Sequence, residues 1–303
     1  MPRPFHTLDV FTDTRFTGNP LAVIPDAAGL DGDEMQRIAR EFNLSETVFV
    51  LPPDNPAHSA KLRIFTPGRE LPFAGHPTVG TAIHLALQKF GGSDHEEDAI
   101  IVLEEGVGPV RVGVRLKPGV APFAEFDVPV LPEEQGAASP NDRLAAALGL
   151  APNEIGFENH APTRFSSGVP FTFVPVANLE VIGRAGPQLQ HWREAFGDHD
   201  HPNAFLYCRQ SVHQDAAFHA RMFAPTMGVP EDPATGAAAA AFAGAIARFD
   251  TLPDGVHSGI VEQGYEMGRV SNIFQEIEME GGKLTKVRIG GHAVPVMEGA
   301  ISD

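Results

Sequence analysis

Short runs of hydrophobic residues, alternating or continuous, recur along this chain, and each is bounded by Gly, Pro, Asp or Asn. Runs of this length and composition are typical of β-strands, and their close spacing indicates mostly antiparallel or mixed sheets. The runs expected to form strands are Thr47–Leu51, Lys61–Phe65, Ile100–Leu103, Val110–Leu116, Phe171–Val176, Ala204–Tyr207, Phe218–Phe223, Asn272–Met279 and Leu284–Ile289.

Helical patterns are fewer and are of two kinds. Gly32–Phe42 is amphipathic, and Asp142–Leu148 and Leu189–Phe196 are short. Pro77–Phe90 and Pro233–Phe249 are instead apolar on nearly every side, which is typical of a helix enclosed by a sheet. The pattern therefore predicts an α/β (α+β) protein with two rolled, mostly antiparallel or mixed sheets, each around one central helix.

The strands and the buried helices occur twice in the same order. Residues 63–82 and residues 221–238 share two short motifs, Arg-x-Phe-x-Pro followed by Pro-x-x-Gly. The matched residues are Arg63 and Arg221, Phe65 and Phe223, Pro67 and Pro225, Pro77 and Pro233, and Gly80 and Gly236. Two further matches, of Gly18–Ile24 with Gly168–Val174 and of Glu104–Gly106 with Glu262–Gly264, keep the offset between 150 and 158 residues. This offset indicates duplication of one domain of roughly 150 residues.

The boundary between the two copies is expected near Pro129–Pro140, because this stretch is rich in Pro, Glu and small residues, as linkers are. The N-terminal half is then residues 1–128 and the C-terminal half residues 129–303. Residues from about 290 to 303 could pack back on the first half.

Composition excludes several classes of function. A chain of 303 residues that is 43% hydrophobic can bury two cores, but its formal net charge of -17 argues against nucleic acid or an anionic membrane as partner. Cys208 is the only cysteine, so no internal disulfide can form and a reducing compartment is expected. The N-terminal residues lack the apolar core of a signal peptide, and no apolar run approaches the roughly 18 residues that cross a bilayer. The sequence therefore predicts a soluble, cytoplasmic protein.

The repeat places His76 opposite Asp232. If Pro77 and Pro233 occupy the first helical position, these two residues are the N-caps of the buried helices. Capping alone could explain Asp232, whereas His is not a favoured cap. A pseudo-twofold axis would bring the two helix starts face to face, in a cleft between the domains. Their unpaired N–H groups and positive dipole ends would favour an anion such as a substrate carboxylate or an enolate.

Glycines beside these positions, Gly75, Gly80 and Gly236, would let backbone approach a ligand closely, although a structural role is the stronger expectation for each glycine taken alone. A base is also needed for proton removal. Glu46 opens an apolar strand, where burial would raise its pKa from about 4.3 toward a value useful for proton shuttling. Its counterpart in the second half falls near Asn203, and the plainer alternative is a solvated glutamate at a strand start.

Other candidate signals are weaker. Asp198–His201 resembles a metal site, but four consecutive residues lack the spacing that converges ligands on one ion, so a solvated loop is expected. Ser93–Asp98 is interpreted as a charged turn. Phosphate-binding glycine loops are not evident, so neither a nucleotide cofactor nor a metal is predicted. Arg63 and Arg221 could bind a carboxylate, but their symmetric recurrence favours a shared structural ion pair.

Six segments spread in order over nearly the whole chain resemble the PhzF family of phenazine-biosynthesis-like isomerases, which have a diaminopimelate epimerase-like fold. These segments are Phe16–Val23, Ser45–Phe49, Arg63–Pro67, Glu70–Thr78, Glu231–Gly236 and Glu262–Ser271. The resemblance implies a cofactor-free isomerase or epimerase acting on a small carboxylate-bearing substrate through an enolate-like intermediate. It also implies a possible homodimer.

The resemblance assigns roles to particular residues. Glu46 would take a proton from carbon and return it elsewhere, with His76 and Asp232 as the other catalytic residues. The substrate-binding residues would be Ser45, Asn19, Gly75, Gly236 and Ala237. The family's founding isomerase, which acts on a dihydro-hydroxyanthranilate, has serine where this chain has Ala237, so a hydroxyl donor is missing here. A catalytically silent ligand-binding or interaction protein on the same fold is therefore the alternative.

Overall fold

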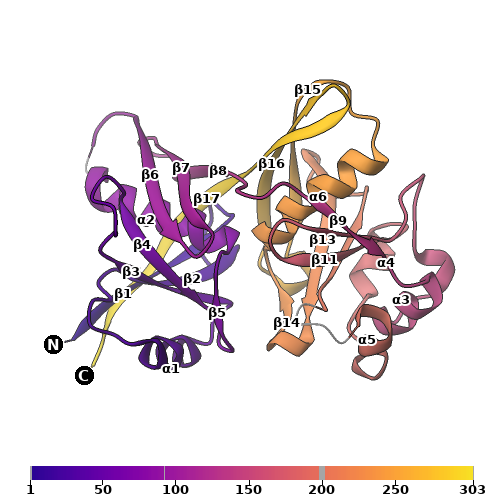
Figure 1. The fold of residues 1–303 in the computed structure, drawn as a ribbon, viewed down its shortest axis with the longest axis horizontal. Helices are drawn as coiled ribbons and strands as arrows, with labels where there is room; N and C mark the ends of the chain where they lie inside the picture. The colour runs from indigo at the N-terminus through magenta and orange to yellow at the C-terminus, as the bar shows by residue number, and fades with distance from the viewer. Residues whose placement is uncertain (1, 92, 198–201, 303) are drawn as a thin grey trace. The chain divides into compact units, whose positions relative to one another are not determined.

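The computed structural model describes residues 2–91, 93–197 and 202–302, and the chain divides into two compact units (Figure 1). Unit 1 contains the residues up to Pro129 together with those from Gly290 onward, and unit 2 contains Val130–Ile289. The last strand, β17 (Lys283–Ile301), therefore begins in unit 2 and ends in unit 1. There it pairs antiparallel with β1 (Arg3–Val10), which places the two chain ends side by side.

Unit 1 is a sheet closed into a ring around one helix. Its strands are β1, β2 (Asn19–Ile24), β3 (Glu46–Leu51), β4 (Ala60–Phe65), β5 (Glu70–Leu71), β6 (Glu97–Glu105), β7 (Gly108–Leu116), β8 (Phe123–Asp127) and the end of β17. Pairing runs β1–β2–β3–β4–β6–β7–β8, and β17 closes the ring because it pairs with both β8 and β1. Helix α2 (Gly75–Phe90) contacts β1, β2, β3, β6, β7 and β8 and so lies inside the ring.

Small residues let α2 lie against the strands around it. A Cβ added to Gly80 would lie 2.6 Å from Leu21 Cδ2 and 2.7 Å from Val10 Cγ2, so a larger residue would push the helix off β1 and β2. The expectation that Gly80 serves close approach to a ligand is therefore wrong. The close approach is to the sheet.

Unit 2 has the same plan. Its strands are β9 (Glu133–Ala137), β10 (Thr163–Ser166), β11 (Pro170–Pro175), β12 (Ala204–Cys208), β13 (Ala216–Ala224), β14 (Val229–Asp232), β15 (Gly255–Gln263), β16 (Ser271–Glu280) and the start of β17, with single 3-10 turns at Pro152–Glu154, Pro225–Met227 and Tyr265–Met267. Helix α6 (Gly236–Phe249) contacts β9, β10, β11 and β16. Its residues from Ala238 to Ile246 are all buried, as its apolar sequence requires.

Strand pairing confirms the duplication. In unit 1, β2 pairs parallel with β3, β3 antiparallel with β4, β4 parallel with β6, and β6 antiparallel with β7. In unit 2, β11, β12, β13, β15 and β16 repeat these pairings in the same order and directions. The hairpins of β4 with β5 and of β13 with β14 also correspond. The predicted fold class, two rolled sheets each around a central helix, is confirmed.

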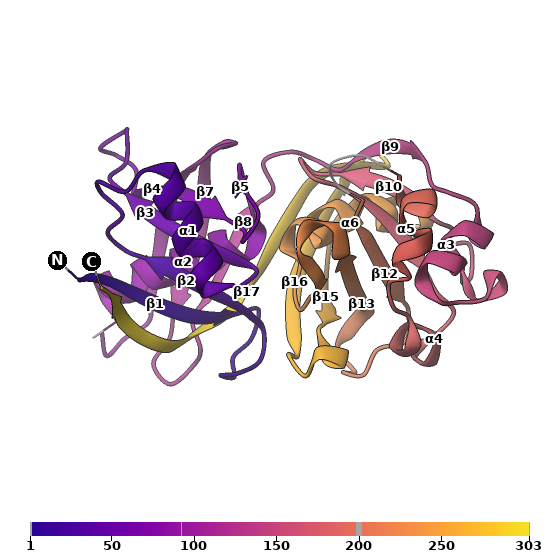
Figure 2. The ribbon, with the colours of Figure 1, turned by 90° about the horizontal axis from the view of Figure 1, so that it is seen from below.

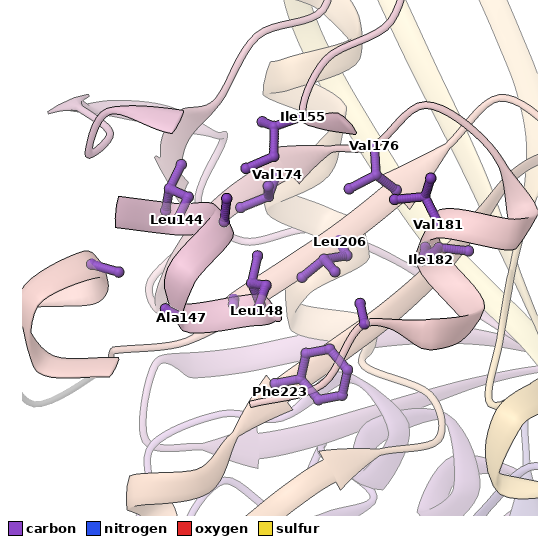
Figure 3. Packing of buried hydrophobic residues seen from close by; sticks show 14 of the residues in the cluster. Leu144, Ala147, Leu148, Ile155, Val174, Val176, Val181, Ile182, Leu206 and Phe223 are labelled. Carbon is purple, nitrogen blue, oxygen red and sulfur yellow. The ribbon is translucent and has the colours of Figure 1, made fainter. Parts of the chain in front are cut away.

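Surface helices cover the outside of each sheet. Helix α1 (Gly32–Phe42) begins with a capping box between Asp31 and Glu34 and buries Met35 and Ala39 in a cluster with residues of β3 and β4. In unit 2, helices α3 (Asn141–Leu148), α4 (Leu179–Arg184) and α5 (Leu189–Phe196) pack on β11 and β12 through a second apolar cluster (Figure 3). Figure 2 shows α3, α4 and α5 on the side of unit 2 away from β15 and β16. None of the helices in the described part of the chain combines the length and apolar character that crossing a bilayer requires.

The stretch expected to be a linker is partly structured. Strand β9 lies within it and pairs antiparallel with β10, with Ala137 opposite Thr163. All five residues of β9 are exposed. Because this strand is held by backbone hydrogen bonds and buries no side chain, its composition resembles that of a loop.

The two arginines of the repeat form the shared ion pair that the sequence suggested. Arg63 Nε and Nη2 donate to the carboxylate of Glu70 at 2.7 and 2.6 Å, and Arg221 makes the same two bonds to Glu231 at 2.8 Å each. Each guanidinium also lies over the phenylalanine two residues later. Arg221 differs in being only 8% exposed, against 30% for Arg63, and in donating to the carbonyls of Ile182 and Ala185.

This difference predicts unequal effects of one conservative substitution. Arg221→Lys should lower the free energy of unfolding by about 2–4 kcal/mol, because lysine cannot reproduce the forked bonds and leaves buried carbonyls unpaired. The matched variant Arg63→Lys should cost less than about 1 kcal/mol, since its pair is half-exposed. Urea unfolding of both variants measures the two values. Equal losses would contradict the assignment of Arg221 as the buried member of the pair.

Candidate active site

Glu46 is the first residue of β3 and lies opposite Leu21 of β2. The next residues of the strand, Thr47–Val50, are buried, so the strand carries Glu46 at the edge of the core, where its side chain is 16% exposed. The plainer expectation of a solvated glutamate therefore does not describe this side chain. The pairing of β3 with β4 and of β12 with β13 makes Asn203, immediately before β12, the counterpart of Glu46.

His76 lies in the first turn of α2, and its position corrects a prediction. The helix begins at Gly75 with Ala74 as N-cap, so His76 is the second helical residue and not the cap. Pro77 is the third residue, which is tolerated because N–H groups of the first turn have no intrahelical acceptor. The hydroxyl of Thr78 bonds to the Ala74 carbonyl at 2.8 Å and reinforces this earlier start.

Glu46 and His76 come together although they lie on different elements. Glu46 Oε2 is 3.4 Å from His76 Nδ1. Although this distance is within ion-pair range, burial lowers the pKa of His76 to about 3, so the imidazole is neutral and the contact is not an ion pair. His76 Nε2 is also buried and has no hydrogen-bond partner among the described residues.

Asp232 ends strand β14 and is 7% exposed. Its carboxylate accepts a hydrogen bond of 2.6 Å from Thr235 Oγ1, and its carbonyl accepts one of 2.7 Å from Gln263 Nε2. Thr235 is the N-cap of α6, which begins at Gly236. The prediction of Asp232 as the N-cap is therefore wrong, because the chain makes a turn through Pro233 and Ala234 before the helix begins.

Neither central helix has a side-chain cap or an acidic residue in its first turn. Gly75 opens α2, and Gly236 and Ala237 open α6. Their backbone N–H groups point out of the helix start, together with the positive end of the helix dipole. Such an arrangement favours an anion.

The remaining predicted residues adjoin these positions. Ser45 immediately precedes Glu46, and Asn19 is the fully buried first residue of β2, two residues before the strand partner of Glu46. Unit 1 therefore contains Asn19, Ser45, Glu46, Gly75 and His76. Asp232, Gly236 and Ala237 belong to unit 2.

Two polar pairs at the helix starts were missed by sequence reasoning. Thr78 Oγ1 lies 2.7 Å from Glu105 Oε1 in unit 1, and Thr235 Oγ1 lies 3.1 Å from Gln263 Nε2 in unit 2. The signal for them was available, because Glu104–Gly106 and Glu262–Gly264 are matched segments of the repeat. Each pair joins the end of a strand to the start of a buried helix.

Two of the weaker candidates, Ser93–Asp98 and Cys208, have plain structural explanations. Ser93–Asp98 leads into β6, and His95 Nε2 contacts Glu97 Oε1 at 2.9 Å on the surface. Asp198–His201 lies outside the described residues. Cys208 is buried, and burial raises the pKa of its thiol to about 12, which leaves it unreactive as a nucleophile.

Two rolled sheets of duplicated topology, each around a central helix, make this a protein of the diaminopimelate epimerase-like fold. A family model described as phenazine biosynthesis-like protein, PhzC-PhzF, matches residues 8–299. The chain belongs to this family.

Known proteins resemble the whole chain. An uncharacterised isomerase of Mesorhizobium japonicum is 53% identical over 99% of this chain and 98% of its own. The trans-2,3-dihydro-3-hydroxyanthranilate isomerase of Pseudomonas aeruginosa is 34% identical over 96% of each chain. A crystal structure of a Bacillus anthracis PhzF-family protein superposes with a TM-score of 0.87 over 100% of both chains, at 27% identity. The protein is accordingly an enzyme of the isomerase class.

Proposed function

We propose that this isomerase moves a proton on a small carboxylate-bearing substrate by general acid–base catalysis without a cofactor. The observation that carries the proposal is the contact of Glu46 with the buried, neutral imidazole of His76. Because the imidazole carries no charge, the contact is not an ion pair, and the Glu46 carboxylate stays available to accept a proton. Glu46 is therefore the group proposed to carry the proton.

The proposed reaction begins when the Glu46 carboxylate removes a proton from a carbon next to a carbonyl or carboxylate group. The electron pair of the broken C–H bond moves into that group and gives an enolate-like intermediate with its charge on oxygen. Glu46, now a carboxylic acid, returns the proton to another carbon of the delocalised system. The net change is an isomerisation that consumes no co-reactant.

Backbone donors are proposed to stabilise the charge that develops on oxygen. The N–H groups at the start of α2, which Gly75 opens, are already ordered by the helix, so they need no reorganisation during the reaction. A preorganised donor of this kind is worth roughly 2.7–4 kcal/mol in the transition state. We propose Asp232, Gly236 and Ala237 as the remaining site residues because they follow the matched strand of the duplicated unit.

Among substrates, the class favoured is a small cyclic or amino carboxylate, since one relative is named for acting on trans-2,3-dihydro-3-hydroxyanthranilate. Ala237 provides no hydroxyl at the start of α6, so a substrate that needs this donor should react slowly. The competing function is ligand binding without turnover, which the missing hydroxyl favours.

Hydrogen exchange distinguishes the two functions. The protein is incubated in D2O with trans-2,3-dihydro-3-hydroxyanthranilate and with a panel of small cyclic and amino carboxylates, and proton NMR follows each C–H signal. We expect deuterium to enter a C–H position of at least one compound at a rate proportional to enzyme concentration. Line broadening without exchange across the panel would instead support the silent binding protein.

A further inference from the structure

The hydroxyl of Thr78 lies between two oxygen atoms that both require its hydrogen. Thr78 Oγ1 is 2.8 Å from the Ala74 carbonyl oxygen and 2.7 Å from Glu105 Oε1. Both distances are typical of O–H···O hydrogen bonds, yet a hydroxyl carries one hydrogen and a carbonyl can only accept. Two full hydrogen bonds form if Thr78 donates to Ala74 and a protonated Glu105 donates to Thr78. An ionised Glu105 would leave the Ala74 carbonyl and the Glu105 carboxylate to share the one hydrogen of Thr78. The geometry therefore favours a proton on Glu105.

The surroundings of Glu105 also disfavour its charged form. Glu105 is only 8% exposed, and its second oxygen, Oε2, is buried without a hydrogen-bond partner among the described residues. An ionised carboxylate in such a place is costly unless it is paired. Burial accordingly raises the pKa of Glu105 to about 8, opposed only by the bond with Thr78.

Among the described residues that line the groove beside Glu105, the basic side chains are already paired with other carboxylates. Together with charged neighbours Glu105 lines this groove of about 960 Å³ in unit 1. These pairs are Lys61 with Asp54 at 2.7 Å, Arg63 with Glu70 at 2.6 Å, and His58 with Glu104 at 2.7 Å. The other titratable residues on the elements packed against β6 are Arg111 and Arg115 on β7 and His76, His84 and Lys89 on α2.

The second copy of the repeat joins the same strand end to its central helix through a neutral residue, although it does so at Thr235, the N-cap of α6, and not at Ala234, the counterpart of Thr78. Gln263, the counterpart of Glu105, donates from Nε2 to Thr235 Oγ1 at 3.1 Å. The Thr235 hydroxyl in turn donates a hydrogen bond of 2.6 Å to Asp232 Oδ2. Gln263 Oε1 accepts from the Thr235 backbone N–H at 3.2 Å. In unit 2, then, a neutral residue at the end of a strand donates to a threonine hydroxyl at the start of the central helix, as a protonated Glu105 would do in unit 1.

We propose that Glu105 is a positioning residue that, in its protonated form, holds the start of α2 and thereby sets the backbone of Gly75 and His76. When Glu105 loses its proton, the Thr78 hydrogen turns to the carboxylate and the Ala74 carbonyl loses its bond. A negative charge also appears beside the helix start proposed to bind the substrate anion. The role in turnover rests on the proposed function, whereas the protonation of Glu105 does not.

The first test needs no substrate. The protein is labelled with 13C at the glutamate side-chain carboxyl carbons and with 15N in the backbone. NMR then follows both sets of signals from pH 5 to 10 in the wild type and in Glu105→Gln. We expect one carboxyl signal to titrate near pH 8 and to be absent in Glu105→Gln. The amide signals of Gly75 and His76 should shift with the same midpoint in the wild type only. A Glu105 signal that is already ionised at pH 5 and does not titrate above it, as the ordinary glutamate pKa of about 4.3 implies, would overturn the proposal whether or not turnover is found.

The second test uses the pH dependence of turnover. In the wild type kcat/KM should fall tenfold per pH unit above about pH 8, and Glu105→Gln should lack this alkaline limb because glutamine still donates to Thr78. Glu105→Ala should lower kcat/KM about tenfold or more at pH 7, and Glu105→Gln should restore most of this loss. The matched control is Glu104→Gln, which should keep the alkaline limb because the pKa of Glu104 is already lowered to about 2 by backbone N–H groups of Asn55 and Asp54.

The outcomes separate the two proposals. An alkaline limb that persists in Glu105→Gln would contradict the proposed positioning role of Glu105 and would leave the proposed isomerase reaction unaffected. If no compound is turned over but Glu105 and the amides of Gly75 and His76 titrate near pH 8, the proposed function is contradicted. The proposal that Glu105 positions the start of α2 is then supported.

Discussion

Replacing Glu46 with glutamine is expected to lower kcat/KM for proton exchange by about 10²- to 10⁴-fold, which is the usual contribution of a positioned acid–base group. Glutamine has the shape of glutamate but cannot take a proton from carbon at neutral pH. The substitution should leave the fold intact, since Glu46 is the first residue of β3 and the buried Thr47–Val50 that follow are unchanged. The measurement is deuterium uptake by NMR together with the thermal unfolding temperature.

A matched control comes from the same unit. Glu41, near the end of α1, is exposed, so Glu41→Gln makes the same chemical change away from the proposed site and should exchange deuterium at the wild-type rate. A Glu46→Gln protein that exchanges as fast as Glu41→Gln would show that another group carries the proton. A Glu46→Gln protein that is unfolded would be replaced by Glu46→Asp, which keeps the carboxylate but shortens its reach and should also slow exchange.

Gly264→Ala is expected to give the largest loss of stability, about 3 kcal/mol or more. Gly264 has a positive φ of 80°, and an added Cβ would meet the carbonyl oxygen of Arg269 and lie 2.6 Å from that of Pro233. Both obstacles are backbone atoms, so neither can rotate away as a side chain would. Because Pro233 follows Asp232, the displacement should reach the start of α6 and also lower activity.

Gly268 provides the control for the backbone conformation alone. Its φ is also positive, at 67°, but an added Cβ meets nothing within 4 Å. Gly268→Ala should therefore cost only the left-handed conformation, about 1–2 kcal/mol. Urea denaturation of the two variants separates the steric collision from the conformational strain. Similar free energies of unfolding for both would contradict the close approach at Gly264.

The duplication was predictable because the residues that recur are ones that stabilise the fold of each unit. Arg63 and Arg221 recur since each holds a glutamate in the following hairpin with two hydrogen bonds. The central helices were predictable for a similar reason, because a helix enclosed by strands must be apolar on every side. The expectation for Gly80 failed because glycine permits close approach of the backbone to a ligand and to a sheet alike. The sequence therefore could not distinguish the two.

The chemical groups at the site were predictable only as a set of candidates. The repeat drew attention to His76 and Asp232, but it placed both wrongly as N-caps, since the caps are Ala74, two residues before His76, and Thr235, three residues after Asp232. Helix ends depend on which backbone groups meet, and here the carbonyls of Ala74 and Thr235 accept the first intrahelical hydrogen bonds. Proline in the first turn allows several starting points, so its position cannot choose among them.

The sequence by itself determined the two-fold repetition, the strands, the two buried helices and the residue types that can move a proton, because each follows from local composition and spacing. Only the tertiary structure decided that Glu46 lies 3.4 Å from His76, that this imidazole is neutral, and that Glu105 lies 2.7 Å from the Thr78 hydroxyl. These facts depend on burial and on contacts between residues about 30 positions apart. Pairing of the strands around α2 creates both, and neither exists in the unfolded chain.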